Sequence, residues 1–109
     1  MAGFKNIVKG EVFTLKEQID YRKHRIISLT ICDTEKIRMV LFSFDEEEAI
    51  TEEQTPNTER FTLIEGRMEV VVDGRKYLLH EKESLWIPPE AEHSLLALAP
   101  SKMLQTSLK

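Results

Sequence analysis

The sequence predicts an all-β domain of short antiparallel strands, arranged as a sandwich or a barrel. The first indication is Asp73-Gly74, which follows the β-branched residues 70–72 and precedes a second strand-like stretch, residues 75–79. An Asp-Gly pair in that position is typical of a type I′ turn, because both central residues of the turn need a positive φ. The second is Glu65-Gly66, which separates two further strand-like stretches. The third is that no sustained helical period is found along the 109 residues.

The hairpin at this Asp-Gly turn is the best-defined element of the prediction. It should place Val72 opposite Arg75 and Val70 opposite Tyr77. The stretch before Gly66 precedes the hairpin with almost no connecting chain. We therefore expect three consecutive antiparallel strands that form a meander, and no parallel strand-helix-strand unit.

The other strands are expected from hydrophobic composition and turn residues. Residues 25–31 and 38–44 are rich in Ile, Val and Phe, whereas residues 11–15 alternate only weakly. A short strand and a turn are expected between residues 49 and 60. With residues 60–64, 68–72, 84–87, 94–98 and 103–108, about ten short strands result. The aromatic side chains expected in the core are Phe42, Phe44, Phe61, Tyr77 and Trp86.

Length, charge and cysteine content limit the class of protein. The length fits one domain, which we place at residues 11–109, with residues 1–10 as an N-terminal tail or edge strand. A net charge of −4 argues against nucleic acid or an anionic membrane as the partner. The single cysteine, Cys32, cannot form an internal disulfide, and no apolar run is long enough for a membrane span or a signal sequence. We expect a cytoplasmic protein.

The spacing of several residues resembles the two motifs of the cupin family. In the first motif a His-x-His pair precedes a Glu, and six residues separate that Glu from a Gly; Glu59 and Gly66 have this spacing. In the second motif a Pro stands five positions before a His, as Pro88 and His93 do. The fifteen residues 67–81 between the motifs match the shortest spacing common in bacterial cupins. The resemblance covers roughly residue 38 to the C-terminus and implies a jelly-roll barrel, the double-stranded β-helix of cupins.

The sequence departs from this family at most of the metal-binding positions. If Glu59 corresponds to the family's metal-binding Glu, then Glu53 and Thr55 stand where the His-x-His pair would be. Two of the four usual ligands are thus absent, and only Glu59 and His93 carry over. Other motif residues also differ: Glu47, Lys82 and Glu90 replace glycines, and Ala97 replaces an Asn.

The resemblance implies two alternatives for the site. In one, Glu59, His93 and Glu53 hold Mn, Fe, Ni or Zn, ions that accept both imidazole and carboxylate ligands. In the other, the pocket holds no metal, and Glu59 and His93 pair or bind an organic ligand directly. The pocket is expected to include Glu59, His93, Glu53, Thr55 and Phe61. Glu59 and Glu53 could instead be solvated charges, and His93 a hydrogen-bonded core histidine.

Two functions follow from these alternatives. The loss of two histidines favours a module that binds a small organic ligand without chemistry. The alternative is a metal-dependent enzyme similar to the cupin dioxygenases, isomerases and decarboxylases, in which Glu59 and His93 act as base and acid. Small cupins commonly pair through sheet faces or exchanged terminal strands, so the resemblance also implies a homodimer.

Overall fold

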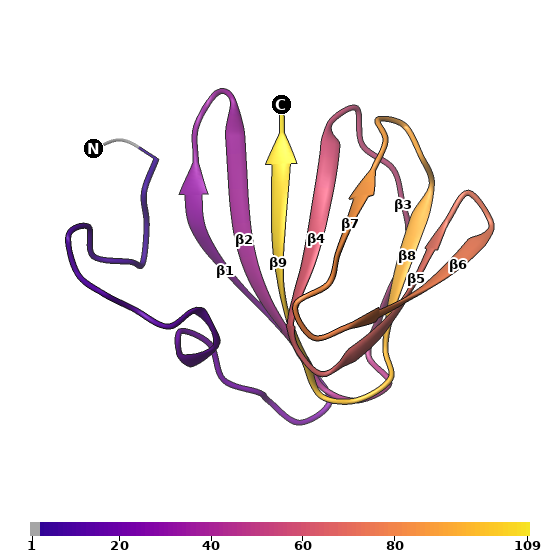
Figure 1. Cartoon of the computed structure of the whole chain (residues 1–109), viewed down its shortest axis with the longest axis horizontal. Helices are drawn as coiled ribbons and strands as arrows, with labels where there is room; N and C mark the ends of the chain where they lie inside the picture. The colour runs from indigo at the N-terminus through magenta and orange to yellow at the C-terminus, as the bar shows by residue number, and fades with distance from the viewer. Residues whose placement is uncertain (1–2) are drawn as a thin grey trace.

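Two antiparallel sheets make up the barrel in a computed structural model that describes residues 3–109 (Figure 1). A short 3-10 helix, η1 (Leu15–Glu17), precedes the strands. The five-stranded sheet has the order β1-β2-β9-β4-β7 and the four-stranded sheet the order β3-β8-β5-β6. The strands are β1 (Ile26–Asp33), β2 (Ile37–Phe44), β3 (Ala49–Glu53), β4 (Thr58–Glu65), β5 (Arg67–Val72), β6 (Arg75–His80), β7 (Ser84–Ile87), β8 (His93–Ala97) and β9 (Ser101–Leu108).

The chain crosses repeatedly between these sheets, which is the jelly-roll arrangement expected from the sequence. β9 pairs with both β2 and β4, and β8 pairs with both β3 and β5. The C-terminal strand therefore lies in the middle of the five-stranded sheet (Figure 1). The fold prediction is confirmed.

The β5–β6 hairpin has the predicted register. Val72 pairs with Arg75 and Val70 with Tyr77. Asp73 and Gly74 have φ values of 47° and 82°, as a type I′ turn requires. The local signal at this turn was sufficient to place both strands.

The predicted meander of three strands is wrong, because β4 and β5 belong to different sheets. β4 pairs with β9 and β7, whereas β5 pairs with β6 and β8. Gly66 connects them with a φ of 97°, and its backbone lies against Pro100 and Ser101. A Cβ atom here would stand 2.4 Å from the Pro100 carbonyl oxygen. The Glu65-Gly66 signal thus marks a corner between sheets and not a hairpin turn.

The core lies between the sheets and follows the alternation of the strands. Phe61 and Leu63 of β4, with Met68 and Val70 of β5, are at most 1% exposed. Of the five aromatic residues expected in the core, Phe44 and Phe61 are buried, and Phe42 and Tyr77 are partly buried.

Trp86 was expected in the core, and this expectation is wrong. Its neighbours Leu85 and Ile87 point into the barrel, so Trp86 points outward from the edge strand β7 and is 52% exposed. The Arg60 guanidinium lies over its ring, 5.4 Å from the centroid.

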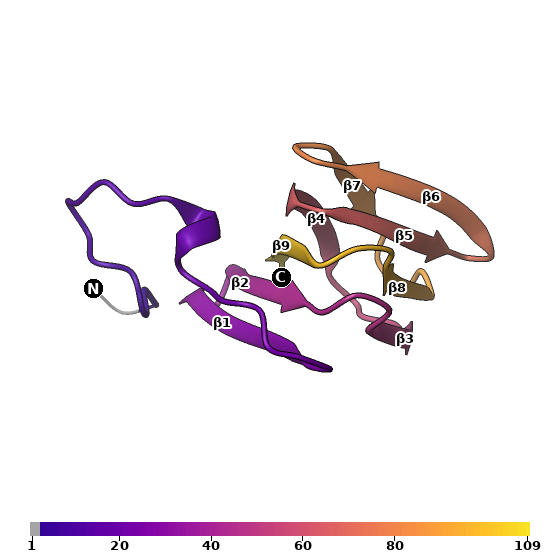
Figure 2. The same ribbon diagram turned by 90° about the horizontal axis from the view of Figure 1, so that it is seen from below.

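Residues 3–25 run beside the barrel, and none of the nine strands lies within them (Figure 2). The strand expected at residues 11–15 is wrong: Val12 is fully exposed, Phe13 is 47% exposed, and η1 follows. Weak alternation alone does not make a strand when the segment does not pair with a sheet. Within the expected tail of residues 1–10, the first two residues lie outside the described chain. Phe4 forms a single antiparallel bridge with Cys32 of the edge strand β1.

No helix within residues 3–109 combines the length and the hydrophobicity needed to cross a bilayer.

Candidate functional site

A cavity of about 690 Å³ lies between the sheets, at the end of the barrel where β9 ends and β2 and β4 begin. Side chains from both sheets line it, together with the loop between β3 and β4. Its walls are mixed: Phe42, Ile50 and Leu95 are apolar, while most other lining residues are polar or charged. A mixed lining of this kind is typical of sites for small polar molecules.

Glu59 is the buried acid of this cavity. It is the second residue of β4 and is only 3% exposed. Its Oε1 atom accepts a hydrogen bond from Gln105 Nε2 at 3.1 Å. Its other oxygen, Oε2, is buried and has no hydrogen-bond partner among the described residues. The interpretation of Glu59 as a solvated strand-end charge is therefore wrong.

His93 begins β8 and is 2% exposed. By the alternation of the strand its ring points inward with Leu95, which lines the cavity. The ring packs against Phe61, with the centroids 5.5 Å apart. Its Nδ1 atom lies 3.1 Å from the Ala91 carbonyl oxygen, whereas the buried Nε2 atom has no hydrogen-bond partner within residues 3–109.

The bond to Ala91 determines the tautomer of neutral His93. A carbonyl oxygen only accepts, so Nδ1 must carry the hydrogen and donate it. In the neutral ring, Nε2 then has a lone pair and acts as an acceptor. The Oε2 atom of an ionised Glu59 is also an acceptor. Both buried atoms without partners thus need a donor or a cation.

Glu53 and Thr55 line the same cavity as Glu59. Glu53 ends β3 in register with His93, and its Oε2 lies 3.9 Å from His93 Nε2. The Glu53 side chain is 50% exposed. Thr55 lies in the following turn, where its hydroxyl accepts a hydrogen bond from the Asn57 backbone at 2.9 Å. Phe61 does not line the cavity, but it supports the His93 ring from the core.

The residues present do not form a complete metal centre. Glu59 and His93 offer the kinds of atom that a divalent ion binds. Glu53, however, is half exposed, and its carboxylate is directed at the His93 ring nitrogen. Across residues 3–109, no group of three or more His, Cys, Asp or Glu side chains is arranged to hold an ion. We therefore derive no chemistry through a metal.

Sequence reasoning missed Arg38, Gln105 and Ser107, which also line the cavity. Gln105 and Ser107 are two residues apart on β9 and share the inward face with Glu59. Arg38 pairs with Ser107 from the other side. Alternation in the last strand could have suggested that Gln105 and Ser107 share a face, but not that this face points inward.

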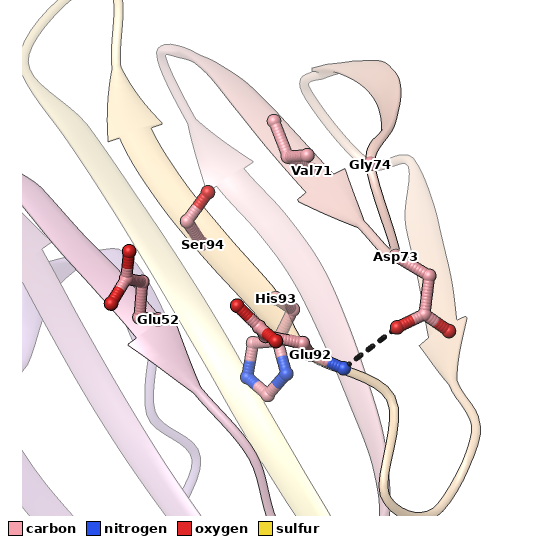
Figure 3. A pocket seen from close by; sticks show the side chains of 7 residues that line it. All are labelled: Glu52, Val71, Asp73, Gly74, Glu92, His93 and Ser94. Carbon is pink, nitrogen blue, oxygen red and sulfur yellow. Dashed lines mark hydrogen bonds between the residues drawn. The ribbon is translucent and has the colours of Figure 1, made fainter.

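A second hollow, of about 290 Å³, lies outside the barrel on the four-stranded sheet. In Figure 3, Ser94 and His93 are neighbours on β8 whose side chains point in opposite directions. The exposed carboxyl groups of Glu52, Asp73 and Glu92 surround this hollow, and Asp73 Oδ1 accepts a hydrogen bond from the Glu92 backbone at 2.9 Å. His93 lines this hollow and is not among the residues that line the larger cavity, whereas Glu59 lines the larger cavity. Glu53, which lines the larger cavity, connects the two, because its carboxylate lies 3.9 Å from His93 Nε2.

Three residues that replace motif glycines keep the backbone conformation of glycine. Glu47, Lys82 and Glu90 have φ values of 71°, 70° and 67°. The Lys82 and Glu90 backbone N–H groups donate to Leu63 and Thr55, respectively. The turns of the family motif are thus retained although their glycines are not.

Comparison with known proteins agrees with this geometry. The structure of a conserved protein of unknown function from Streptococcus pyogenes matches with a TM-score of 0.94 and 23% identity, covering 100% of this chain and 96% of that one. A cupin superfamily protein from Desulfitobacterium hafniense matches with a TM-score of 0.92 and 24% identity, covering 98% of both chains. A search of curated proteins found no match. At these identities the structural likeness establishes the fold alone.

The family assignment comes from the sequence itself. The family model described as "Cupin domain" matches residues 40–105, which is more than half of the 109-residue chain. This segment contains β3 to β8, most of β2 and most of β9, and therefore both Glu59 and His93. The protein belongs to the cupin family.

Proposed function

We propose that this cupin domain binds a small organic ligand in the cavity between its sheets. The observation that carries the proposal is that Glu59 Oε2 and His93 Nε2 are buried without hydrogen-bond partners among the described residues. A buried polar group left unsatisfied costs about 1–3 kcal/mol. Glu59 lines the cavity, so a ligand that donates a hydrogen bond to Glu59 Oε2 would recover that cost. The unpartnered atom therefore supports ligand binding at this position.

The alternative is an enzyme that uses Glu59 and His93 as base and acid. Its support is that a carboxylate oxygen and an imidazole nitrogen, groups that can accept or donate a proton, are buried without hydrogen-bond partners among the described residues. The family also includes metal-dependent dioxygenases, isomerases and decarboxylases, but the incomplete donor set of this chain speaks against that chemistry. We rank ligand binding first.

We also propose that the protein is a cytoplasmic homodimer. Phe4, Val8 and Phe13 are 46%, 65% and 47% exposed, respectively, and line a mostly apolar hollow of about 210 Å³ beside β1. Exposed apolar groups of this kind favour an interface. The molar mass in solution, measured by light scattering, tests this: a mass near 12.7 kDa at all concentrations would exclude the dimer.

The test of ligand binding is a thermal-shift screen of small metabolites in the presence of a chelator. We expect at least one compound to raise the Tm of wild type but not that of Glu59→Gln or His93→Gln. The matched controls are Glu46→Gln and His80→Gln, which change exposed residues of the same types and should respond like wild type. Hits that also stabilise Glu59→Gln and His93→Gln would contradict the proposed site.

Metal content separates the two functions. Protein purified without a nickel column, and then incubated with Mn, Fe, Zn or Ni salts, should contain no stoichiometric ion. A stoichiometric ion that is lost in His93→Gln, together with a turnover that depends on it, would favour the enzyme. Ligand binding that is unchanged by the chelator would favour the binding module.

A further inference from the structure

We propose that the ligand is a small carboxylic acid whose opposite end carries hydroxyl or ammonium groups. This inference rests on the proposed function and identifies the class of molecule bound. In this arrangement the donor groups lie at Glu59, and the carboxylate lies at Arg38, which lines the same cavity.

The inner end of the cavity favours hydrogen-bond donors. Glu59 lines this end and is 3% exposed, and its Oε2 atom has no partner within residues 3–109. Gln105 already donates to the other Glu59 oxygen. The Glu53 carboxylate lines the same cavity, so a ligand carboxylate placed here would be repelled. A hydroxyl or ammonium group can instead donate to Glu59 Oε2.

At the outer end of the cavity, Arg38 provides a cation in cross-strand register with Glu59. Glu59 pairs with Ser107, and Ser107 pairs with Arg38, so the three residues follow one another across β4, β9 and β2. All three line the cavity. Neighbouring strands are about 4.8 Å apart, so the Glu59 and Arg38 backbones are separated by roughly 10 Å. A ligand of about four to six carbon atoms fits between the two side chains.

Arg38 is available for an anionic ligand. The nearby Asp33 is paired with Lys109, whose Nζ lies 2.7 Å from Asp33 Oδ1. This hydrogen bond, and to a lesser extent Arg38, hold the pKa of Asp33 below its ordinary value. Arg38 itself is exposed and makes no hydrogen bond or ion pair with another described side chain. Its planar guanidinium matches a carboxylate with two parallel hydrogen bonds.

Apolar groups occupy the space between the two ends. Phe42 lies on the inward face of β2, four residues after Arg38, and Ile50 and Leu95 approach from the four-stranded sheet. These side chains can cover the carbon skeleton of the ligand. A molecule charged along its whole length would not fit these walls.

The affinities of four small molecules, measured by calorimetry, test the proposed class of ligand. 6-Hydroxyhexanoate and 5-aminopentanoate carry a carboxylate at one end and a donor at the other, sorbitol has donors only, and hexanoate has a carboxylate only. We expect 6-hydroxyhexanoate or 5-aminopentanoate to bind at least tenfold more tightly than sorbitol or hexanoate. Whichever of these two acids binds more tightly shows whether the site prefers a hydroxyl or an ammonium donor.

The variant Arg38→Gln tests the outer contact. It should weaken binding of the carboxylate probe about tenfold, as expected for one lost charge-assisted contact, and leave sorbitol unchanged. Arg67→Gln, at an exposed arginine of β5, is the control and should behave as wild type. Equal affinity of wild type and Arg38→Gln for the carboxylate probe would overturn the inference.

The two proposals fail separately. If hexanoate or sorbitol binds best, and Glu59→Gln abolishes that binding, the cavity is a ligand site but the proposed class is wrong. If none of the four probes binds, the inference is also wrong, and the wider metabolite screen decides whether the cavity binds ligands.

Discussion

Glu59 is the residue at which stability and ligand binding are expected to oppose each other. Its Oε2 atom is buried without a partner, while Gln105 bonds only to Oε1. Such a group lowers the stability of the unliganded protein and can be satisfied only when a donor enters. His93 Nε2 is likewise buried without a hydrogen-bond partner among the described residues, and Glu53 Oε2 lies 3.9 Å from it.

Replacing Glu59 with an apolar residue of similar shape should stabilise the protein. We predict that Glu59→Met raises the free energy of unfolding by about 1–2 kcal/mol, because the buried unsatisfied oxygen is removed. Gln105 is only partly buried, so its freed amide can bond to water. Urea unfolding measures the change, and Glu46→Met at an exposed turn is the control. A loss of 1 kcal/mol or more in Glu59→Met would mean that the carboxyl group is satisfied in the native state.

At the residue scale, the sequence could identify Glu59 and His93 because the spacing of the motifs places both. It could not identify Gln105 or Arg38. Their roles depend on the register of β9 against β4 and of β2 against β9, which joins segments more than 40 residues apart. No local pattern encodes that register.

At the scale of the strands, Gly66 forms the corner at which the chain passes from one sheet to the other. Its φ is 97°, and an added Cβ would lie 2.3 Å from Ser101 Oγ and 2.4 Å from the Pro100 carbonyl oxygen. Ser101 Oγ also donates to the Arg67 carbonyl oxygen and accepts from the Arg67 N–H. The corner between β4 and β5 is thus packed against the start of β9.

We predict that Gly66→Ala destabilises the protein by about 3 kcal/mol or more, since a backbone clash adds to the cost of a positive φ. Gly74→Ala is a matched control: its φ is 82°, but no atom lies within 4 Å of the added Cβ. It should cost only about 1–2 kcal/mol, the cost of the conformation alone. Chemical denaturation of both variants measures the difference. Equal losses would mean that the corner relaxes around the methyl group.

The two turns also show which elements could be predicted. Asp73-Gly74 encodes a hairpin, because the strands it joins pair with each other. Glu65-Gly66 has a similar composition, yet its strands pair with β9 and β8, so no signal within the turn distinguishes a corner from a hairpin. Trp86 was misplaced for a related reason: its strand lies at a sheet edge, where the outer face is open to solvent.

At the scale of the whole molecule, the barrel could be predicted but the path of the N-terminal segment could not. Turn spacing and the motif residues were enough for the jelly roll. The segment before β1 packs through contacts with distant residues: Ile19 is buried, and the Ser43 hydroxyl donates to the Asp20 carbonyl oxygen. Neither contact has a signature in the segment itself.

Tyr21 connects this segment to the barrel most directly. Its hydroxyl donates to Glu65 Oε2 at 2.5 Å, and the Lys102 ammonium lies 5.0 Å from its ring centroid. Lys102 also donates to the Lys16 carbonyl oxygen. Burial, followed by the hydrogen bond to Glu65, raises the pKa of Tyr21 well above its ordinary value. The neutral hydroxyl is therefore the form that the folded protein favours.

We predict that Tyr21→Phe lowers the free energy of unfolding by about 1 kcal/mol at pH 7, the loss of one hydrogen bond to a partly exposed carboxylate. Because the pKa is raised on folding, this contribution is complete below the unfolded pKa of about 10 and is lost as the pH rises above it. The difference between wild type and variant should therefore shrink above pH 10.

The variant Tyr77→Phe is the control, because the Tyr77 ring contacts Arg75 and no hydrogen bond of its hydroxyl is found within residues 3–109. Hydrogen exchange then localises the effect. The amides of Glu17 and Gln18 donate to the Thr14 and Leu15 carbonyl oxygens around η1. These amides should exchange faster in Tyr21→Phe, whereas the amides of β9 should not. Uniformly faster exchange would show that Tyr21 stabilises the whole barrel, and unchanged exchange would show that Ile19 and Lys102 hold the segment without it.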